Sequence, residues 1–162
     1  MKTIVILVLL IPIQGVLGQN INSDSVTFRE NLDKYINREF LTLSTDTQLS
    51  SLETKYGTPL NSVGKCLVIF SRGDLNEVEL RSMAVRAQEI ATKFYEEGTP
   101  IYLSIGGSQS SEWTKRQNEK GNNKGLTFVS LGNYCVVEKG DHDFERIFNK
   151  KTLELVGIER VE

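Results

Sequence analysis

The chain has 162 residues, of which 39% are hydrophobic, and it carries 19 lysines and arginines against 21 aspartates and glutamates. This length suits a single domain with a leader, and charges of both signs are interleaved as on an ordinary solvated surface. The net charge of −2 and the lack of a clustered basic stretch argue against a nucleic-acid-binding protein.

Residues 1–18 have the three parts of a secretory signal peptide. Lys2 gives a positive start, residues 4–11 are uncharged and apolar, and Pro12 breaks that run before a cleavage site ahead of Gln19. The alternative is a membrane anchor, which needs a longer run of roughly 20 apolar residues. We therefore expect cleavage to release a secreted, extracellular protein with no membrane span.

The two cysteines and the single histidine limit the redox and metal chemistry. Cys66 and Cys135 do not form a Cys-x-x-Cys motif, and they make a poor zinc site with only His142 beside them. Export permits a disulfide between the two cysteines. If they lie two strands apart in one sheet, however, they are ~9–10 Å from each other, beyond disulfide reach. Both states stay open, and we expect no metal and no cofactor.

The first half of the mature chain is predicted to be largely helical. Apolar residues at three-to-four spacing predict a helix over residues 26–43, and a second, short helix is expected over residues 47–55. Residues 66–70, Cys-Leu-Val-Ile-Phe, form a continuous apolar run that favours a strand buried on both faces.

The helix predicted over residues 75–97 is the most strongly specified element. Asp74 or Asn76 can cap its start, and Gly98 can end it. The positions expected to face the core are Leu80, Ala84, Ala87, Ala91 and Phe94.

The second half alternates strand-like and helical segments. After Pro100, residues 101–105 are expected to form a buried strand, and residues 106–108, Gly-Gly-Ser, a flexible turn. The remaining predicted elements are a helix over residues 111–119, strands over 126–131 and 134–137, a helical turn over 143–148 and a weak final strand within 152–161.

The order of these elements predicts the fold class. Strands alternating with helices pack naturally as parallel strands joined by right-handed crossovers. We therefore predict an α/β protein, a three-layer sandwich with a small, mostly parallel sheet flanked by helices. Residues 19–65 are expected to be a helical N-terminal segment of the same domain, and residues 66–162 its α/β core.

Residues 66–148 resemble the C-terminal half of a von Willebrand factor type A domain. The resemblance lies in the order of features: the Leu-Val-Ile-Phe strand, the long helix, a strand ending in Ile-Gly-Gly, a further helix, the strand around Cys135 and the final Asp-Phe-Glu-Arg-Ile-Phe segment. It covers about half of the chain and implies an α/β domain that binds proteins.

That family commonly binds its partners through a divalent cation held by an Asp-x-Ser-x-Ser loop, a threonine and a further aspartate. This chain has no Asp-x-Ser-x-Ser sequence, and Arg72 stands where the family's later loop has its aspartate. A fixed positive charge there would repel a cation. The resemblance therefore implies a degenerate relative without a metal.

Arg72-Gly73-Asp74 is an Arg-Gly-Asp tripeptide in a chain expected to be extracellular. One interpretation is an adhesive integrin ligand, in which Asp74 completes a metal site of the receptor and Arg72 reaches an acidic pocket. The other is a turn between a strand and a helix, with Asp74 as the helix cap. With Ser71, these residues form the first candidate binding loop.

Gly106-Gly107-Ser108 is the second candidate binding loop. Backbone amides between a strand and a helix can bind an anion. The segment lacks the Gly-x-Gly-x-x-Gly spacing and the lysine of a phosphate loop, so a tight turn is the competing interpretation.

Asp141-His142-Asp143 places the only histidine between two carboxylates, which suits a general base. No Gly-x-Ser-x-Gly motif accompanies it, and the segment also reads as an exposed helix cap. An extracellular hydrolase that uses Asp and His is therefore one alternative function.

The sequence as a whole favours a secreted, non-enzymatic binding protein whose partner is another extracellular protein. We expect the two candidate loops to make the contacts, because open α/β sheets bind ligands at the carboxyl ends of their strands. No catalytic residue is predicted. The alternatives are the hydrolase and the Arg-Gly-Asp adhesive ligand.

Overall fold

A computed structural model of the chain describes residues 32–120, 125–131, 139–159 and 161. Its elements, in chain order, are η1 (Leu32–Ile36), α2 (Thr47–Tyr56), α3 (Val63–Ser71), α4 (Glu77–Glu96), β1 (Ile101–Ser104), α5 (Gly107–Glu119), β2 (Thr127–Ser130) and α6 (Lys139–Val156). No helix in these ranges is long and apolar enough to cross a membrane.

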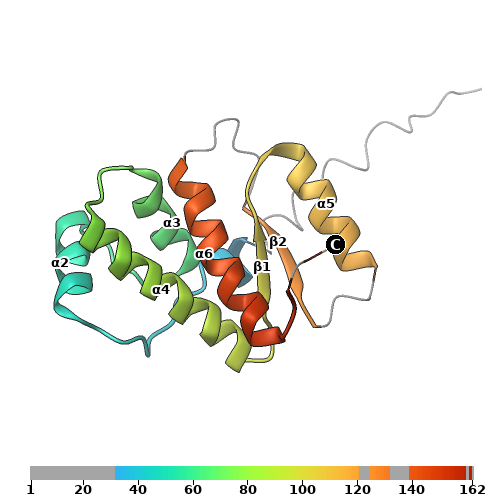
Figure 1. Ribbon diagram of the computed structural model, residues 1–162, viewed down its shortest axis with the longest axis horizontal. Helices are drawn as coiled ribbons and strands as arrows, with labels where there is room; N and C mark the ends of the chain where they lie inside the picture. Colours follow the sequence, from blue (N-terminus) through green and yellow to red (C-terminus); the bar gives the residue numbers. More distant parts are fainter. Residues whose placement is uncertain (1–31, 121–124, 132–138, 160, 162) are drawn as a thin grey trace, which may run out of the picture.

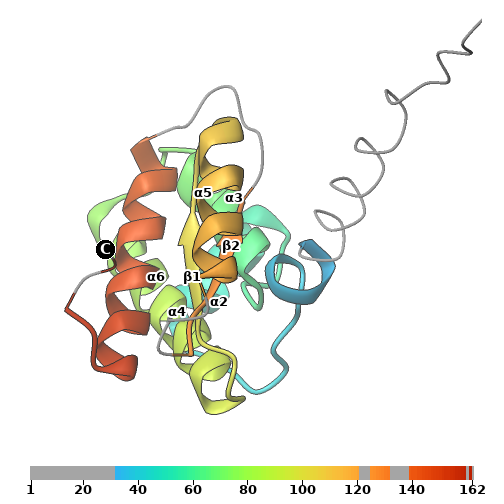
Figure 2. The same ribbon diagram turned by 90° about the vertical axis from the view of Figure 1, so that its right-hand side faces the viewer.

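The two strands form a parallel sheet, with Ile101 paired to Thr127 and Ser104 to Ser130. Helix α5 makes the crossover between them, and it lies on one side of the sheet while α2, α3 and α4 lie on the other (Figure 1). Figure 2 shows α6 beside β1. The predicted α/β class, with a small parallel sheet flanked by helices, is confirmed.

Both outer edges of this sheet are closed by asparagine side chains. The side-chain amide of Asn149 on α6 donates to the carbonyl of Leu103, and its oxygen accepts from the Leu103 N–H, both at 2.8 Å. Asn118 on α5 makes the same pair of 2.8 Å bonds with the backbone of Phe128. Each amide replaces a neighbouring strand, so no backbone group of Leu103 or Phe128 is left unpaired.

The strand predicted over residues 66–70 is wrong, because these residues belong to α3. Ser62 caps this helix by accepting a hydrogen bond from the Lys65 N–H at 3.3 Å. Every residue of 66–70 is buried except Val68, which is 59% exposed. A short run that is apolar throughout suits a buried helix as well as a buried strand. The part of the von Willebrand resemblance that rested on this strand therefore loses its basis.

The predictions for α2 and α4 are confirmed, with one correction. Asp46 caps α2 through the Leu49 N–H at 2.7 Å, and Asn76, not Asp74, caps α4 in a capping box with Glu79. Ala87, Ala91 and Phe94 are buried as predicted. Leu80, which is 41% exposed, and Ala84, which is partly buried, do not belong to the buried face. The buried residues of this helix are Met83, Arg86, Ala87, Ile90, Ala91 and Phe94.

The helix predicted over residues 26–43 is wrong beyond residue 36. Residues 26–31 lie outside the described residues, η1 is a single π-helical stretch, and an irregular segment over residues 37–46 follows. Tertiary contacts hold this segment. The Phe40 N–H donates to the Asn61 carbonyl at 2.8 Å.

The backbone of Ser44 in the same segment is held from α4. Its N–H donates to the Glu89 carboxylate at 2.5 Å, and its carbonyl accepts from the buried Arg86 guanidinium at 2.6 Å. These bonds to side chains satisfy backbone groups that a helix would otherwise pair internally.

The C-terminal predictions need three corrections. Gly107 and Ser108 belong to the start of α5 and not to a flexible turn. The helical turn predicted over residues 143–148 is part of the longer α6, and the strand predicted within residues 152–161 is wrong because α6 continues to Val156. The predicted strand over residues 134–137 lies outside the described residues.

The first turn of α6 packs closely on the end of α3. Asp141 is buried and accepts a hydrogen bond from the Ser71 hydroxyl. A Cβ atom at Gly140 would collide with the Phe70 carbonyl. Glycine at this position therefore lets the two helices meet.

Candidate functional site

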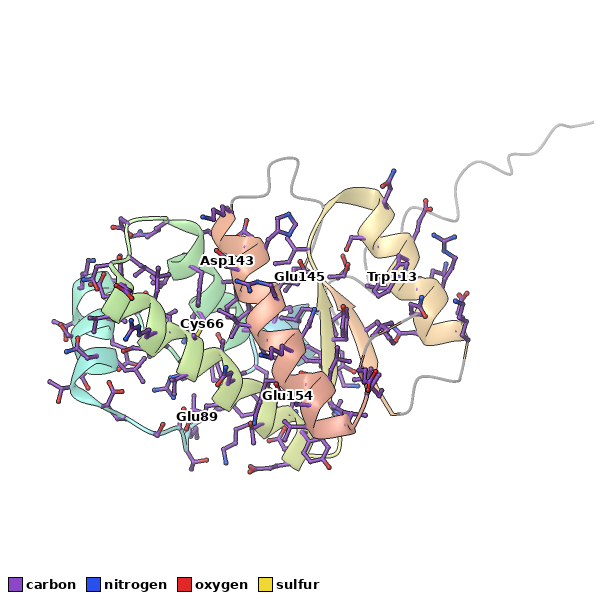
Figure 3. All side chains as sticks on the ribbon, in the orientation of Figure 1. Cys66, Glu89, Trp113, Asp143, Glu145 and Glu154 are labelled. Carbon is purple, nitrogen blue, oxygen red and sulfur yellow. The ribbon has the colours of Figure 1, made fainter. Side chains whose placement is uncertain are left out.

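An open groove of about 870 Å³ runs along the exposed face of α6. The residues that line it come from β1, from α6 and from the turn that follows α6: Tyr102, His142, Glu145, Arg146, Asn149, Lys150, Leu153, Glu154, Gly157, Ile158 and Glu159. In Figure 3 the labelled Asp143, Glu145 and Glu154 lie along α6, and Trp113 lies across the sheet on α5. Concave sites with a few placed polar groups are where small proteins most often hold ligands.

Tyr102 on β1 is the aromatic residue of the groove lining, and two other aromatic rings pack against it. Its ring lies 6.0 Å from Trp113 and 5.4 Å from Phe128, and those two rings meet edge to face at 5.3 Å. Burial raises the pKa of the Tyr102 hydroxyl, the negative charge of Glu145 raises it further, and the Asn149 amide lowers it. Tyr102 is therefore a fixed, neutral phenol at neutral pH.

The inner row of groove residues on α6 is Glu145, Asn149 and Leu153. Glu145 lies between two partners: one carboxylate oxygen is 3.4 Å from the Ile105 N–H, and the other is 3.3 Å from Nδ1 of His142. Asn149 is engaged by the edge of β1. The polar groups of Glu145 and Asn149 are therefore engaged in contacts within the protein. Leu153 adds an aliphatic side chain to the groove lining.

The outer row of groove residues on α6 is His142, Arg146, Lys150 and Glu154. These positions are spaced by four residues, so their side chains form a ridge along the helix. The side chain of His142 is 63% exposed, and those of Arg146 and Lys150 are each 76% exposed. Arg146 pairs with Asp143 at 3.0 Å, and Lys150 lies 4.0 Å from the Glu154 carboxylate, so the ridge presents paired charges of both signs.

The groove offers His142 no adjacent nucleophile. Its lining contains no serine, threonine or cysteine. The nearby Ser71 hydroxyl donates to the Leu67 carbonyl at 2.8 Å and also bonds Asp141, while His142 pairs with Glu145. Within the described residues, the groove lining therefore places no serine, threonine or cysteine beside His142, as the alternative hydrolase would need.

The first predicted loop, Ser71 to Asp74, joins α3 to α4 and does not follow a strand. The Tyr56 hydroxyl donates to the Asp74 carboxylate at 2.8 Å, and the Arg72 guanidinium lies 5.1 Å from the centre of the Tyr56 ring. Gly73 has a φ of 70°, which lets the chain turn between the two charged residues. Arg72, Gly73 and Asp74 are all exposed.

The second predicted loop lies at the carboxyl end of β1. Gly106, with a φ of 130°, is the residue before α5, and as a glycine it has no side chain to cap that helix. Hydroxyl groups gather beneath it: Ser110 bonds Ser104 at 2.8 Å and Ser111 lies 3.2 Å from Ser130. The described bonds of these hydroxyls are made within the cluster or to the backbone.

The structure brings each predicted loop next to α6 without joining the two. Ser71 bonds Asp141, and Ile105, just before Gly106, approaches Glu145. The groove, which extends from His142 along α6 to Glu159, was not predicted. Its only sequence signal was the four-residue spacing of residues 142, 146, 150 and 154, which has meaning only once residues 139–156 are known to form one helix.

The described residues contain no group of three or more His, Cys, Asp or Glu side chains that could hold a metal ion. Cys66 has no exposed surface, and burial raises the pKa of its thiol to about 12. Cys135 lies outside the described residues, so the pairing of the two cysteines stays a prediction.

No known protein family, curated protein or solved structure matches this chain. The functional conclusion therefore rests on the geometry of the groove and on the sequence.

Proposed function

We propose that this protein is a secreted, non-enzymatic binding protein that holds an extracellular protein partner in the groove along α6. The observation that carries the proposal is the open groove of about 870 Å³, in which the Tyr102 ring and the aliphatic side chain of Leu153 lie beside an exposed charged ridge. Apolar surface supplies affinity in such sites, and the charges at the rim orient the partner.

The rigidity of the groove supports binding to a partner. Tyr102 is fixed by two aromatic neighbours, and Asn149 is fixed by both of its bonds to Leu103. A surface that is already ordered loses little conformational entropy when a partner docks on it. The proposal includes no metal and no cofactor.

Site-specific crosslinking tests the groove as the binding surface. A photoreactive phenylalanine analogue replaces Lys150 in one variant and Arg81, on the exposed side of α4, in a control variant. The two native side chains have nearly the same exposure, 76% and 77%. We expect a defined adduct from extracellular fluid at position 150, abolished by excess unlabelled chain, and none at position 81. Equal adducts at both positions, or none at either, would overturn the proposal.

The secreted location is proposed from the leader pattern of residues 1–18. Expression of the full chain in secreting cells tests it. We expect protein in the medium whose first residue is Gln19 by mass spectrometry. Retention of the intact chain, Met1 included, inside the cells would contradict secretion.

The exposed Arg72-Gly73-Asp74 loop supports a second candidate function, adhesion to a cell-surface receptor. Both charged residues contact Tyr56: Asp74 accepts a hydrogen bond from its hydroxyl, and Arg72 lies over its ring. These contacts would have to break before a receptor could bind the two residues. Asp74→Glu keeps the charge but moves the carboxylate, so it should abolish cell attachment if the loop is the ligand. Attachment equal to that of the unmodified chain would exclude this function.

A further inference from the structure

The Arg-Gly-Asp tripeptide of residues 72–74 is the exposed part of a loop whose two ends are fixed. At the α3 end, the Ser71 hydroxyl donates to the Leu67 carbonyl at 2.8 Å. At the α4 end, Asn76 caps the helix and forms a capping box with Glu79. The loop therefore has a fixed frame, and the charged side chains within it have the most freedom to move.

Both of these charged side chains converge on Tyr56, the last residue of α2. The Asp74 carboxylate accepts a hydrogen bond from the Tyr56 hydroxyl at 2.8 Å, and the Arg72 guanidinium lies 5.1 Å from the centre of its ring. One tyrosine therefore engages the acidic and the basic group of the tripeptide at the same time.

Tyr56 itself is held in place. Its ring is partly buried and packs against the hydrophobic core. The Lys55 ammonium lies 4.9 Å from the centre of the ring and pairs with the Glu79 carboxylate at 3.0 Å. A ring that packs against the core cannot follow the loop, so Arg72 and Asp74 move outward only by breaking their contacts with it.

We infer that Tyr56 makes an autoinhibitory contact with the Arg-Gly-Asp loop, and that a receptor binds only the open form, in which Arg72 and Asp74 have left the ring. An adhesive receptor takes the carboxylate at a metal site and the guanidinium in a separate acidic pocket, so the two groups must point apart. In the closed form they both face one phenol. This inference rests on the second candidate function, adhesion, and adds its regulation.

The inhibition is expected to be modest, because Arg72 and Asp74 are both exposed to solvent. A hydrogen bond or a cation–π contact at an exposed site favours one form by about threefold, and the two contacts together by about tenfold. A receptor that binds only the open form sees its affinity reduced by the same factor. Removal of the contacts should therefore raise receptor binding by a limited but measurable amount.

Two substitutions remove the contacts in steps. Tyr56→Phe removes the hydrogen bond and keeps the ring, whereas Tyr56→Leu also removes the ring and keeps an apolar side chain against the core. The matched control is Tyr95→Phe, at a tyrosine on α4 that is 42% exposed. Thermal unfolding of each variant verifies that it folds, and Tyr56→Phe carries the test if Tyr56→Leu does not fold.

Cell attachment to surfaces coated with graded amounts of each chain measures receptor binding. Half-maximal attachment should need about threefold less Tyr56→Phe and about tenfold less Tyr56→Leu than unmodified chain, and the same amount of Tyr95→Phe. Asp74→Glu added to either Tyr56 variant should abolish attachment, because the open loop still needs its carboxylate in the right place.

Trypsin provides a second measurement that needs no receptor. This protease takes an arginine side chain into an acidic pocket, so cleavage of the folded chain after Arg72 reports the release of that side chain. Cleavage should be faster in Tyr56→Leu than in the unmodified chain, and unchanged in Tyr95→Phe.

The two measurements separate failure of the inference from failure of the adhesive function. Attachment that depends on Asp74 but is equal with and without Tyr56 leaves adhesion and overturns the autoinhibitory contact. Unchanged cleavage after Arg72 in Tyr56→Leu overturns it as well, because the arginine would then be free already. No attachment by any variant, the open ones included, removes adhesion and the inference with it.

Discussion

Replacing Asn149 by alanine should destabilise the protein more than replacing Asn118 by alanine. Both residues make the same pair of 2.8 Å bonds to a strand edge, so the two variants delete the same interactions. They differ in burial: the bonds between Asn149 and Leu103 are buried, whereas the bonds between Asn118 and Phe128 are part-buried.

The burial sets the expected magnitude. Without the Asn149 amide, the N–H and the carbonyl of Leu103 stay buried with no partner, and each unpaired buried group costs about 1–3 kcal/mol. Asn149→Ala should therefore lower the free energy of unfolding by about 2–6 kcal/mol. Water can replace the Asn118 amide at its part-buried bonds, so losing two bonds worth about 0.5–1.5 kcal/mol each means that Asn118→Ala should cost about 1–3 kcal/mol.

Urea unfolding followed by circular dichroism measures both costs, with the slopes compared to verify that both variants unfold in the same way. A cost for Asn149→Ala that matches the cost for Asn118→Ala would refute the reasoning. It would mean either that water reaches Leu103 or that the sheet edge is not closed by α6.

Three further outcomes are expected. Gly140→Ala should destabilise by about 1–3 kcal/mol in urea unfolding, because its methyl group would collide with the Phe70 carbonyl; an unchanged midpoint would show that α3 and α6 do not meet so closely. Cys66, whose pKa is raised to about 12 by burial, should not react with a thiol reagent at pH 8 until the chain is unfolded; rapid native labelling of Cys66 in a Cys135→Ser variant would contradict its burial. The raised pKa of Tyr102 stabilises the fold fully below the unfolded value of about 10, and this contribution is lost as pH rises through the folded pKa. Tyr102→Phe should therefore lose less stability between pH 9 and 11 than the unmodified chain, and parallel losses would contradict the cause.

The sequence predicted best those elements whose first and last residues are marked by a capping residue, a glycine or a proline. Asp46 and Gly57 bound α2 as polar cap and left-handed glycine, and Pro100 and Gly106 bracket β1. These residues act on the backbone beside them, so their effect does not depend on distant packing. The α/β class followed from the order of the marked elements.

Elements defined by distant contacts could not be predicted in the same way. In α3 an unbroken apolar run gave no period, and burial on several sides made a helix possible where a strand was expected. In α6 the buried face includes Asp141, Asn149 and Thr152, so polar residues interrupted the apolar pattern. Those polar residues are buried through contacts such as the bonds to Ser71 and Leu103, which only the folded chain reveals.

The groove was missed for the same reason. It needs α6 to be one long helix, Tyr102 to be fixed on β1, and the turn after α6 to fold back beside both. The predicted loops were chosen because they would follow parallel strands, and only the Gly106 loop does so. The Ser71 to Asp74 loop lost that position when its strand proved to be a helix.

The hydrogen bonds between the backbone of Ser44 and side chains of α4 affect how this part of the protein unfolds locally. The irregular segment over residues 37–46 has no internal ladder, yet the N–H of Ser44 is bonded to Glu89 and its carbonyl to Arg86, and Phe40 is bonded to Asn61. The amides of Phe40 and Ser44 can exchange with solvent only when their bonds break, and Arg86, which bonds the Ser44 carbonyl, is buried on α4. In hydrogen exchange the Phe40 and Ser44 amides should therefore open together with α4, as one cooperative unit, although they lie in a stretch without regular structure.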